Sequence, residues 1–480
     1  MLMLDDETRA KLWPRVIETI EKYLTEIETA RPAPQLDVEG IRANLRNYDF
    51  TRPMNALEAV DYVSAQMWRH LVHNGHPRYF GLFNPAAATM GIVADALVAA
   101  FNPQLAAWSH SPFPIEAEYH LLRAFGERFG YDQSQMDGTF CSGGSEANHT
   151  ALLTALNNAF PEFNEWGASG LSAPPVFYIS SQGHHSFLKA AKMSGIGTAA
   201  VREIPLAEDL RMDLSLLESQ IAADKTAGLH PLMIVGTAGA TSTGVVDPLV
   251  ELAEIARRER IWFHVDAAWG GGAAFVPGLR QSALTGIELA DSITFDAHKW
   301  LSAPMGAGVY LTRHPQILKQ TFDVATGYMP RDAAGLDVVD PYTHSIQWSR
   351  RFIGLKVFMS LLVAGWDGYE AVIKNQVVLG DILRQKLGAS GWRVINQTPL
   401  PVVCFVDGSH QHGQSADYLE AVVRTIVQSG QAWISIARIG EPSTPVIRAG
   451  ITSYRTTEKE VDALVDSLNL ARQQILTNKL

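Results

Sequence analysis

The stretch 294–300 reads Thr-Phe-Asp-Ala-His-Lys-Trp, and the fold and chemistry of this chain are organised around it. A strand-like run, 290–295, leads into it, and 306–312 is predicted to be the next strand. Lys299 therefore stands at the mouth of a core strand, between a histidine and an indole. Desolvation and nearby cations lower the pKa of a lysine and free its amine to form a Schiff base. Taken alone, such a lysine is more often one that snorkels to water, so the rest of the chain decides.

Composition narrows the class of protein. At 480 residues the chain is long enough for two or three domains. It is 47% hydrophobic and 19% charged, as globular proteins are, with no apolar run long enough to span a membrane and no signal-peptide pattern. The net charge of −11, without a Lys/Arg-rich block, argues against nucleic-acid or membrane partners. Two cysteines, Cys141 and Cys404, fit a reducing, cytoplasmic setting, and we predict no metal site.

Three regions follow from the pattern along the chain. Helical spacing dominates before residue 138, over 6–30, 56–72, 86–100 and 115–129, with aromatic, proline-bearing loops at 76–85 and 102–114. We predict a helical N-terminal segment, 1–85, that forms a dimer, a large α/β domain, 86–355, and a small C-terminal α+β domain, 356–480. Within the large domain, 323–348 is predicted to be a loop that carries Tyr328.

Strand and helix alternate after residue 138. Predicted strands at 139–142, 175–179, 232–236, 261–265 and 292–295 are each followed by a loop, most of which lead into a helix. This alternation predicts a mostly parallel central sheet with helices on both faces. Ligands of such sheets bind at the carboxyl ends of the strands. The Gly-rich turn at 143–144, His184, Thr241, Asp266 and Lys299 all fall at such ends, so we expect them to converge.

These residue types together match the needs of pyridoxal 5′-phosphate. Gly144 and Ser145 offer donors for a phosphate at a helix N-terminus. Asp266 can keep a pyridine nitrogen protonated, so that the ring acts as an electron sink. Lys299 supplies an amine for the aldehyde, and His184 supplies a flat partner for the ring.

At this point the chain resembles the group II pyridoxal-dependent decarboxylases, which include the aromatic-L-amino-acid, tyrosine, histidine and glutamate decarboxylases. The resemblance rests on the segments 76–80 (His-Pro-Arg-Tyr-Phe), 144–147 (Gly-Ser-Glu-Ala), 264–268 (His-Val-Asp-Ala-Ala) and 298–300 (His-Lys-Trp). It implies a type I PLP-dependent transferase-like fold. It also implies a homodimer whose active sites are shared between subunits, with an amino acid as the small-molecule substrate.

The resemblance also implies roles for single residues. Lys299 is the Schiff-base lysine, Asp266 pairs with the pyridinium, and His184 stacks on the ring. Ser145 and His298 contact the phosphate, and Ala268 packs against the opposite ring face. Tyr328 matches the loop tyrosine that returns a proton to the substrate carbon. We therefore expect Lys299, His184, Tyr328 and Asp266 to be catalytic.

The chain departs from the family pattern at two positions. Asp296 stands where many members have an asparagine beside the phosphate, and an ionised carboxylate there would repel a phosphate dianion. We therefore assign Asp296 no phosphate contact. Ala240 stands where a threonine is common, so Thr241 aligns only loosely as a cofactor-binding residue.

The predicted activity is decarboxylation of an L-amino acid to its amine, with an aromatic substrate preferred. The expected substrate pocket comes from the two aromatic loops and consists of Tyr79, Phe80, Leu82, Phe83, Trp108 and His110. Arg78 and His110 could instead serve an acidic side chain, and Arg448 could contact the substrate carboxylate or be an ordinary strand arginine. An aminotransferase, an aldehyde synthase or a non-catalytic cofactor-binding paralogue remain as alternatives on the same fold.

Overall fold

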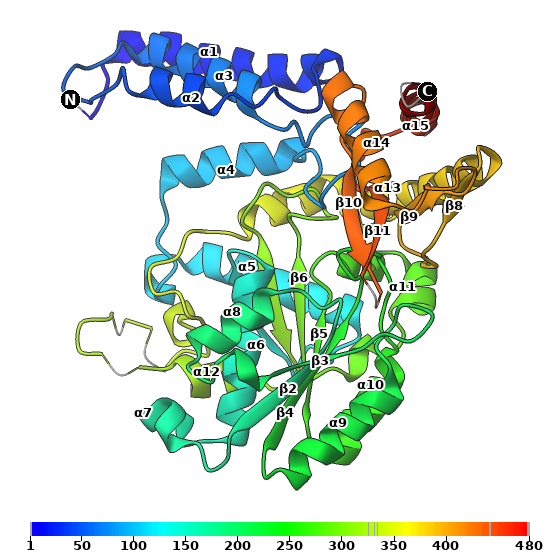
Figure 1. Ribbon diagram of the computed structural model, residues 1–480. Helices are drawn as coiled ribbons and strands as arrows, with labels where there is room; N and C mark the ends of the chain where they lie inside the picture. The colour runs from blue at the N-terminus through cyan, green and yellow to red at the C-terminus, as the bar shows by residue number, and fades with distance from the viewer. Residues whose placement is uncertain (1, 325, 331, 334, 441–442, 478–480) are drawn as a thin grey trace.

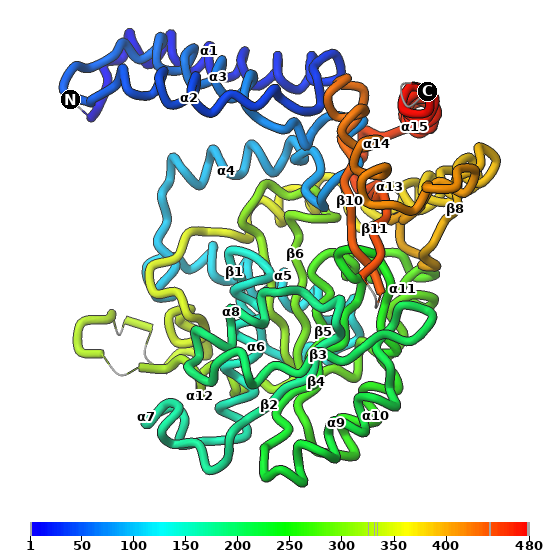
Figure 2. Tube along the Cα trace, viewed as in Figure 1, coloured from blue at the N-terminus to red at the C-terminus, as the bar shows by residue number. Residues whose placement is uncertain are grey.

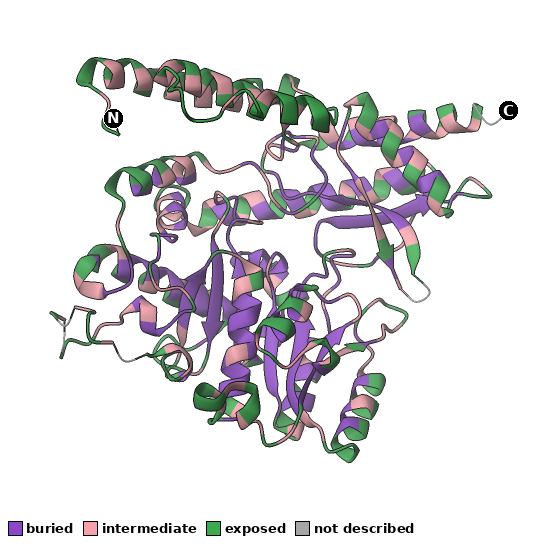
Figure 3. Ribbon diagram, turned by 60° about the vertical axis from the view of Figure 1, so that its left-hand side comes forward, coloured by how far each residue is buried: buried purple, intermediate pink, exposed green. Residues whose placement is uncertain are grey.

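The computed structural model describes residues 2–324, 326–330, 332–333, 335–440 and 443–477 (Figure 1). The chain begins with a layer of helices set apart from the sheet, as Figure 2 shows. This layer consists of α1 (Asp6–Glu26), α2 (Val38–Leu45) and α3 (Ala56–His70). Neither α1 nor α3 has a buried residue, and Figure 3 shows this layer as a mixture of exposed and intermediate residues. Two further helices, α4 (Thr89–Phe101) and α5 (Pro112–Phe129), lead into the large domain.

A seven-stranded sheet forms the centre of the large domain, in the order β1-β7-β6-β5-β4-β2-β3. The strands are β1 (Asp137–Cys141), β2 (Pro175–Ser180), β3 (Val201–Ile204), β4 (His230–Thr237), β5 (Trp262–Asp266), β6 (Ser292–Asp296) and β7 (Gly308–Thr312). Only β7 runs against its neighbours, pairing antiparallel with both β6 and β1. The mostly parallel sheet predicted from the sequence is confirmed.

Helices cover both faces of this sheet because its strands are apolar on both sides. Along β4, Ile234 packs into the core beneath α9 and α10, while Met233 and Val235 pack into the core beneath α6 and α8. Alternate residues of a strand point to opposite faces, so a strand buried on both sides lacks a polar stripe. The covering helices of the large domain are α6 (Gly144–Ala159), α7 (Phe163–Trp166), α8 (Ser186–Met193), α9 (Leu214–Thr226), α10 (Leu249–Glu259), α11 (Pro277–Ala283) and α12 (Ile317–Phe322).

A four-stranded antiparallel sheet and three helices form the C-terminal part, as the predicted α+β domain requires. The strands are β8 (Trp392–Val394), β9 (Val402–Asp407), β10 (Ser435–Ile439) and β11 (Thr444–Gly450), and the helices are α13 (Leu355–Ala389), α14 (Ala416–Ser429) and α15 (Glu458–Thr477). The predicted domain boundaries stay a prediction. Within the described ranges, no helix is long and apolar enough to cross a membrane.

Several element bounds differ from those expected. The sequence pattern predicts a helix over 350–366, but the helix begins at Leu355 and continues to Ala389, across a bend where Gly365 has a φ of 62°. A left-handed residue interrupts the helical spacing, which explains why the pattern breaks at that point. The sequence pattern also predicts a strand over 433–436, but Trp433 lies before β10 and bridges to Tyr79.

Candidate active site

A cavity of about 410 Å³ lies where the carboxyl ends of β4, β5 and β6 meet the first turn of α6. All eight residues predicted to bind the cofactor line it: Gly144, Ser145, His184, Thr241, Asp266, Ala268, His298 and Lys299. The parallel arrangement of the strands brings these residues together, as expected from their positions at strand ends.

The turn between β1 and α6 leaves backbone donors facing the cavity. Gly144 and Ser145 stand at the first helical positions, where N–H groups have no partner within the helix. Glu146 fixes the turn, because its carboxylate accepts the Ser142 N–H at 2.9 Å and the Ser142 hydroxyl at 2.6 Å. β7 packs tightly behind the turn: a Cβ added at Gly308 would lie 2.5 Å from the Cα atom of Gly143. The backbone here is therefore held in place from both sides.

Lys299 is held by the aspartate that departs from the family pattern. Its Nζ lies 2.9 Å from Oδ2 of Asp296, whose other oxygen has no hydrogen-bond partner among the described residues. His298 accepts the Ala307 N–H at its Nδ1, at 3.1 Å, so the proton of the neutral ring sits on Nε2. Burial lowers the pKa of His298, which favours this neutral form. Its Nε2–H therefore remains a donor beside the Gly-rich turn.

Asp266 is buried and receives two hydrogen bonds at the end of β5. The Asn148 amide donates to Oδ2 at 2.8 Å, and the Ala268 N–H donates to Oδ1 at 3.1 Å. Donors on both oxygens stabilise the ionised carboxylate. The Asn148 amide also donates to the Ser186 hydroxyl at 2.9 Å, so one side chain joins Asp266 to the loop that carries His184.

The tautomer of His184 follows from its neighbours. The Ser186 backbone N–H points at His184 Nδ1, at 3.2 Å, and the Ser186 hydroxyl lies 2.8 Å from the same atom. A backbone N–H can only donate, so Nδ1 is an acceptor and the proton sits on Nε2. Burial lowers the pKa of His184, which keeps the ring neutral. The ring thus presents an Nε2–H group at the cavity.

The same network continues behind Asp266 into the core. Asn148 uses its amide hydrogens on Asp266 and Ser186, so its Oδ1 must accept from His264 Nε2, at 3.2 Å. His264 Nδ1 then accepts from the Ser292 hydroxyl at 2.8 Å. Burial lowers the pKa of His264 to about 4, so the ring stays neutral and passes no charge to Asp266. Thr294 Oγ1 lies 3.3 Å from the same Nε2 atom, so the His264 ring is held between two oxygens at this end of the network.

Sequence reasoning missed Asn148 and two further residues that line the cavity, Asn84 and Met305. Asn148 had a signal: on α6 it shares a face with Ala151, Leu152 and Ala155, all buried. One polar residue on an apolar helix face needs a buried partner. Asn84 and Met305 lie on loops without a recognisable pattern.

The residues predicted for the substrate pocket do not gather at this cavity within one chain. Phe80 and Phe83 lie in the core, and Tyr79 is buried against Trp433 with ring centroids 5.2 Å apart. Leu82 is exposed. Two more predicted residues, Trp108 and His110, belong to a short 3-10 turn and are half-buried and exposed, respectively. Their role in substrate binding stays a prediction.

Tyr328 is exposed and does not line the cavity of its own chain. Its ring stacks on Trp348, with centroids 5.9 Å apart and the planes inclined by 29°. Three residues of this loop, 325, 331 and 334, lie outside the described residues. The catalytic role of Tyr328 stays a prediction.

Arg448 is buried between the small domain and the cavity. Its guanidinium donates to the backbone oxygens of Thr241, at 2.9 Å, and Gly81, at 2.5 Å, and lies over the Phe83 ring at 4.6 Å. Nη2 has no partner among the described residues. Arg448 therefore joins the aromatic loop to the loop after β4, and its Nη2 group remains available to donate a hydrogen bond.

The cavity offers a matching group for the phosphate, the ring nitrogen and the aldehyde of pyridoxal 5′-phosphate. One end presents unpaired N–H groups at a helix N-terminus, where an anion is favoured. The other end presents Asp266, a buried carboxylate that a protonated ring nitrogen would complement. Lys299 lies between them, 22% exposed, with its amine at the cavity.

Comparison with known proteins agrees with this chemistry. The family model for the pyridoxal-dependent decarboxylase conserved domain matches residues 45–406. An aromatic-L-amino-acid decarboxylase of Bacillus atrophaeus is 28% identical over 99% of this chain and 97% of its own length. An aspartate 1-decarboxylase of Aliivibrio fischeri is 31% identical over 79% of this chain and 73% of its own length.

The fold is likewise found in a solved structure. The crystal structure of Oryza sativa TDC with PLP and tryptamine superposes with a TM-score of 0.92 at 22% identity, covering 99% of both chains. This likeness establishes the type I PLP-dependent fold that the sequence predicted. Because the family model covers most of the chain, the protein belongs to the pyridoxal-dependent decarboxylases, enzymes whose cofactor is pyridoxal 5′-phosphate.

Proposed function

We propose that this enzyme decarboxylates an aromatic L-amino acid to the corresponding amine. The observation that supports it is the convergence of Lys299, Asp266 and the Gly-rich turn on one cavity. The bound cofactor would supply an electron sink for the pair of electrons left when CO₂ departs. The chain's own residues must hold the reactants, exclude water and move protons.

We assign the cofactor contacts as follows. Gly144, Ser145 and the Nε2–H of His298 donate to the phosphate. Asp266 would pair with the protonated ring nitrogen, and the Asn148 amide and the Ala268 N–H donate to its two oxygens. Lys299 supplies the amine that binds the aldehyde, and Asp296 orients it.

His184 and Ala268 enclose the ring from its two faces in this proposal. The neutral imidazole of His184 adds no positive charge to the site and offers its Nε2–H to the bound molecule. Thr241 lines the same cavity, and its carbonyl is fixed by Arg448. Tyr328 returns a proton to the substrate carbon after CO₂ has left.

We propose that the substrate carries an aromatic side chain. The aromatic loops carry apolar side chains, which would favour an aromatic side chain over a carboxylate where these loops reach the site of the partner subunit. An acidic substrate is the second candidate, since an aspartate decarboxylase is among the relatives. Arg78 could serve such a substrate, although it already donates to Gln431 Oε1 at 3.1 Å.

A CO₂-release screen against the standard L-amino acids and L-DOPA tests the proposal. An aromatic amino acid should give the highest rate, with stoichiometric amine. Lys299→Ala should abolish the release, while Lys192→Ala, an exposed lysine on α8, should leave it unchanged. Consumption of an α-keto acid without CO₂ would contradict the proposal and favour an aminotransferase.

We further propose that the enzyme is a cytoplasmic homodimer with shared active sites. Large apolar side chains on α1 and α3 are exposed in the single chain, among them Trp13, Ile17, Val63 and Met67. A contiguous exposed apolar face is typical of an interface. Both cysteines are free and buried, which suits a reducing compartment.

A mixed dimer tests the shared sites. Chains carrying Lys299→Ala and chains carrying Tyr328→Phe are co-expressed with different tags and the mixed dimer is purified. If Tyr328 acts across the interface, the intact Lys299 site receives a tyrosine and releases amine. If Tyr328 acts in its own chain, that site holds a phenylalanine and the amine is lost.

A further inference from the structure

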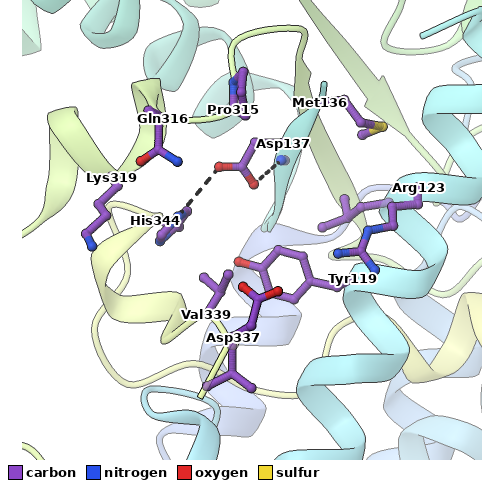
Figure 4. Close-up of a pocket in the computed structure, with 13 residues that line it drawn as sticks. Tyr119, Arg123, Met136, Asp137, Pro315, Gln316, Lys319, Asp337, Val339 and His344 are labelled. Atoms are coloured by element: carbon purple, nitrogen blue, oxygen red, sulfur yellow. Dashed lines mark hydrogen bonds and ion pairs between the residues drawn. The ribbon is translucent and has the colours of Figure 1, made fainter. Parts of the chain in front are cut away.

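A second cavity, of about 370 Å³, lies away from the Lys299 site, at the start of β1 (Figure 4). Tyr119 and Arg123 of α5 line one side, and Asp337 and His344, from the segment that follows the Tyr328 loop, line the other. Asp137, the first residue of β1, points between them. None of these residues takes part in the chemistry proposed above.

Asp137 is a buried carboxylate with an unused acceptor. Its side chain is 8% exposed, and Oδ1 accepts the Gly138 N–H at 2.7 Å. Oδ2 has no hydrogen-bond partner in the described part of the chain, and His344 Nε2 lies 3.6 Å away. Burial lowers the pKa of His344 to about 4, so the ring is neutral, and burial raises the pKa of Asp137 to about 7, so a cation at Oδ2 would shift this carboxyl towards its ionised form. A buried acceptor without a donor is destabilising, so a ligand that donates there gains free energy.

The charges around the cavity restrict the ligand. Arg123 forms no ion pair with any described residue, so its guanidinium is available for a carboxylate. Lys319 lines the same cavity as a second cation, and the two cations favour a carboxylate, while Asp137 and Asp337 disfavour a phosphate or another multiply charged anion. No group of three or more metal-ligating side chains occurs among the described residues, which disfavours a metal ion.

An apolar wall completes the site. Leu122, Met136 and Val339 line the cavity beside these charged groups. A volume of this size is within the range of small-molecule pockets. The complement is a molecule with an ammonium group for Asp137, a carboxylate for Arg123 and an apolar body.

We propose that this cavity is a second, non-catalytic binding site for an apolar α-amino acid. The ligand would join β1 and α5 to the segment 337–344 and so hold one end of the loop that carries Tyr328. The inference depends on the cavity alone and does not require the proposed decarboxylation.

Hydrogen–deuterium exchange of the holoenzyme tests the site with three matched probes: L-leucine, 3-methylbutylamine and 4-methylpentanoate. L-leucine should protect peptides that cover 119–123 and 337–344. The amine, which lacks the carboxylate, should bind about tenfold more weakly, and the acid should give no protection. Peptides over 141–148 and 298–306 report separately on the Lys299 cavity, so turnover there is not mistaken for binding here.

Two variants and a control localise the effect. Asp137→Asn should weaken the leucine-dependent protection roughly tenfold or more, because the ammonium loses its charged partner. Arg123→Gln changes an exposed residue and should remove the preference for L-leucine over the amine. Asp132→Asn, on the exposed turn just before β1, should behave as wild type.

Unchanged leucine protection in both Asp137→Asn and Arg123→Gln would overturn the proposal. Equal protection by all three probes would overturn it as well. An inactive enzyme that still shows the protection would refute the proposed decarboxylation and leave this site standing.

Discussion

Asp266 and Asp137 are both buried aspartates at strand ends, yet their surroundings differ. Asp266, at the end of β5, has a donor on each oxygen and a network of neutral side chains behind it. Asp137, at the start of β1, has one backbone donor and a second oxygen that is buried without a partner among the described residues. The first carboxylate is stabilised in its charged form by the protein itself. The second carboxylate has an oxygen without a donor in the protein, so a bound ligand could stabilise its charged form.

Asp266→Asn should give the largest effect and sharpen this contrast. The amide cannot carry the charge that a protonated ring nitrogen needs, so kcat/KM for CO₂ release should fall by roughly 10³-fold. The rate is measured with the best substrate of the screen, at saturating cofactor. Asp137→Asn should stay within about twofold of wild type. A comparable loss in both variants would show that the two aspartates do not differ in role.

Asn148→Ala should give the next largest effect, because it removes a donor from Asp266 and the link to Ser186. By analogy with residues that orient metal ligands, we expect a loss of about 10–100-fold in activity or cofactor affinity. The affinity is measured by titrating apoenzyme with pyridoxal 5′-phosphate and following tryptophan fluorescence.

Asn157→Ala is the matched control on the same helix, since Asn157 only donates to the backbone oxygen of Gln320. Equal losses in the two asparagine variants would mean that α6 as a whole is sensitive and that the network has no special role.

Tyr328→Phe tests the loop 323–348, whose residues Asp337 and His344 line the Asp137 cavity. We expect the product to shift from amine to aldehyde with oxygen uptake, because the hydroxyl that returns the proton is gone. Amine, aldehyde and oxygen are measured in the same reaction. Tyr342→Phe, whose ring also packs on Trp348, at 5.0 Å, should keep the amine. An unchanged amine yield in Tyr328→Phe would remove Tyr328 from the mechanism.

The smallest effect concerns the stability of the fold around Asp137. Burial raises the pKa of Asp137 from 3.8 to about 7. Below pH 4 the carboxyl is protonated in both folded and unfolded chains, so its ionisation does not change the free energy of unfolding there. As the pH rises from 4 to 7 the unfolded chain ionises first, and the folded state loses stability. The charged or titratable groups around it are Tyr119, Arg123, Lys319, Asp337 and His344.

Asp137→Asn should therefore gain stability relative to wild type between pH 4 and pH 7, by about 1–2 kcal/mol. Urea unfolding of the holoenzyme at each pH measures the difference. A difference that does not change with pH would mean that the folded carboxyl ionises normally. Saturating L-leucine should reduce the gap at pH 7, because it stabilises only the wild type.

Much of the Lys299 cavity could be predicted from the sequence, and the reason is geometric. Parallel strands bring their carboxyl ends to one edge of the sheet, so the positions of His184, Asp266 and Lys299 at strand ends predict that they lie close together. The strand β3 was missed because Val-Arg-Glu-Ile is short and its pattern is weak. The predicted substrate residues could not be placed, since their burial depends on packing between distant segments, as the contact of Tyr79 with Trp433 illustrates.

The Asp137 cavity had no sequence signal at all. Its walls come from α5, β1 and the segment after the Tyr328 loop, about 200 positions apart in the chain. No periodicity or motif records a contact of that kind, and an aspartate before a strand is an ordinary turn residue.

The close approach of Gly308 to Gly143 has a consequence for how this sequence can evolve. Any side chain at position 308 would press on backbone atoms, which no rotamer change at position 143 could relieve. The antiparallel strand β7 and the turn before α6 are therefore held against each other through a residue without a side chain. A substitution at position 308 is expected to displace this turn, although the glycine itself contributes no chemistry.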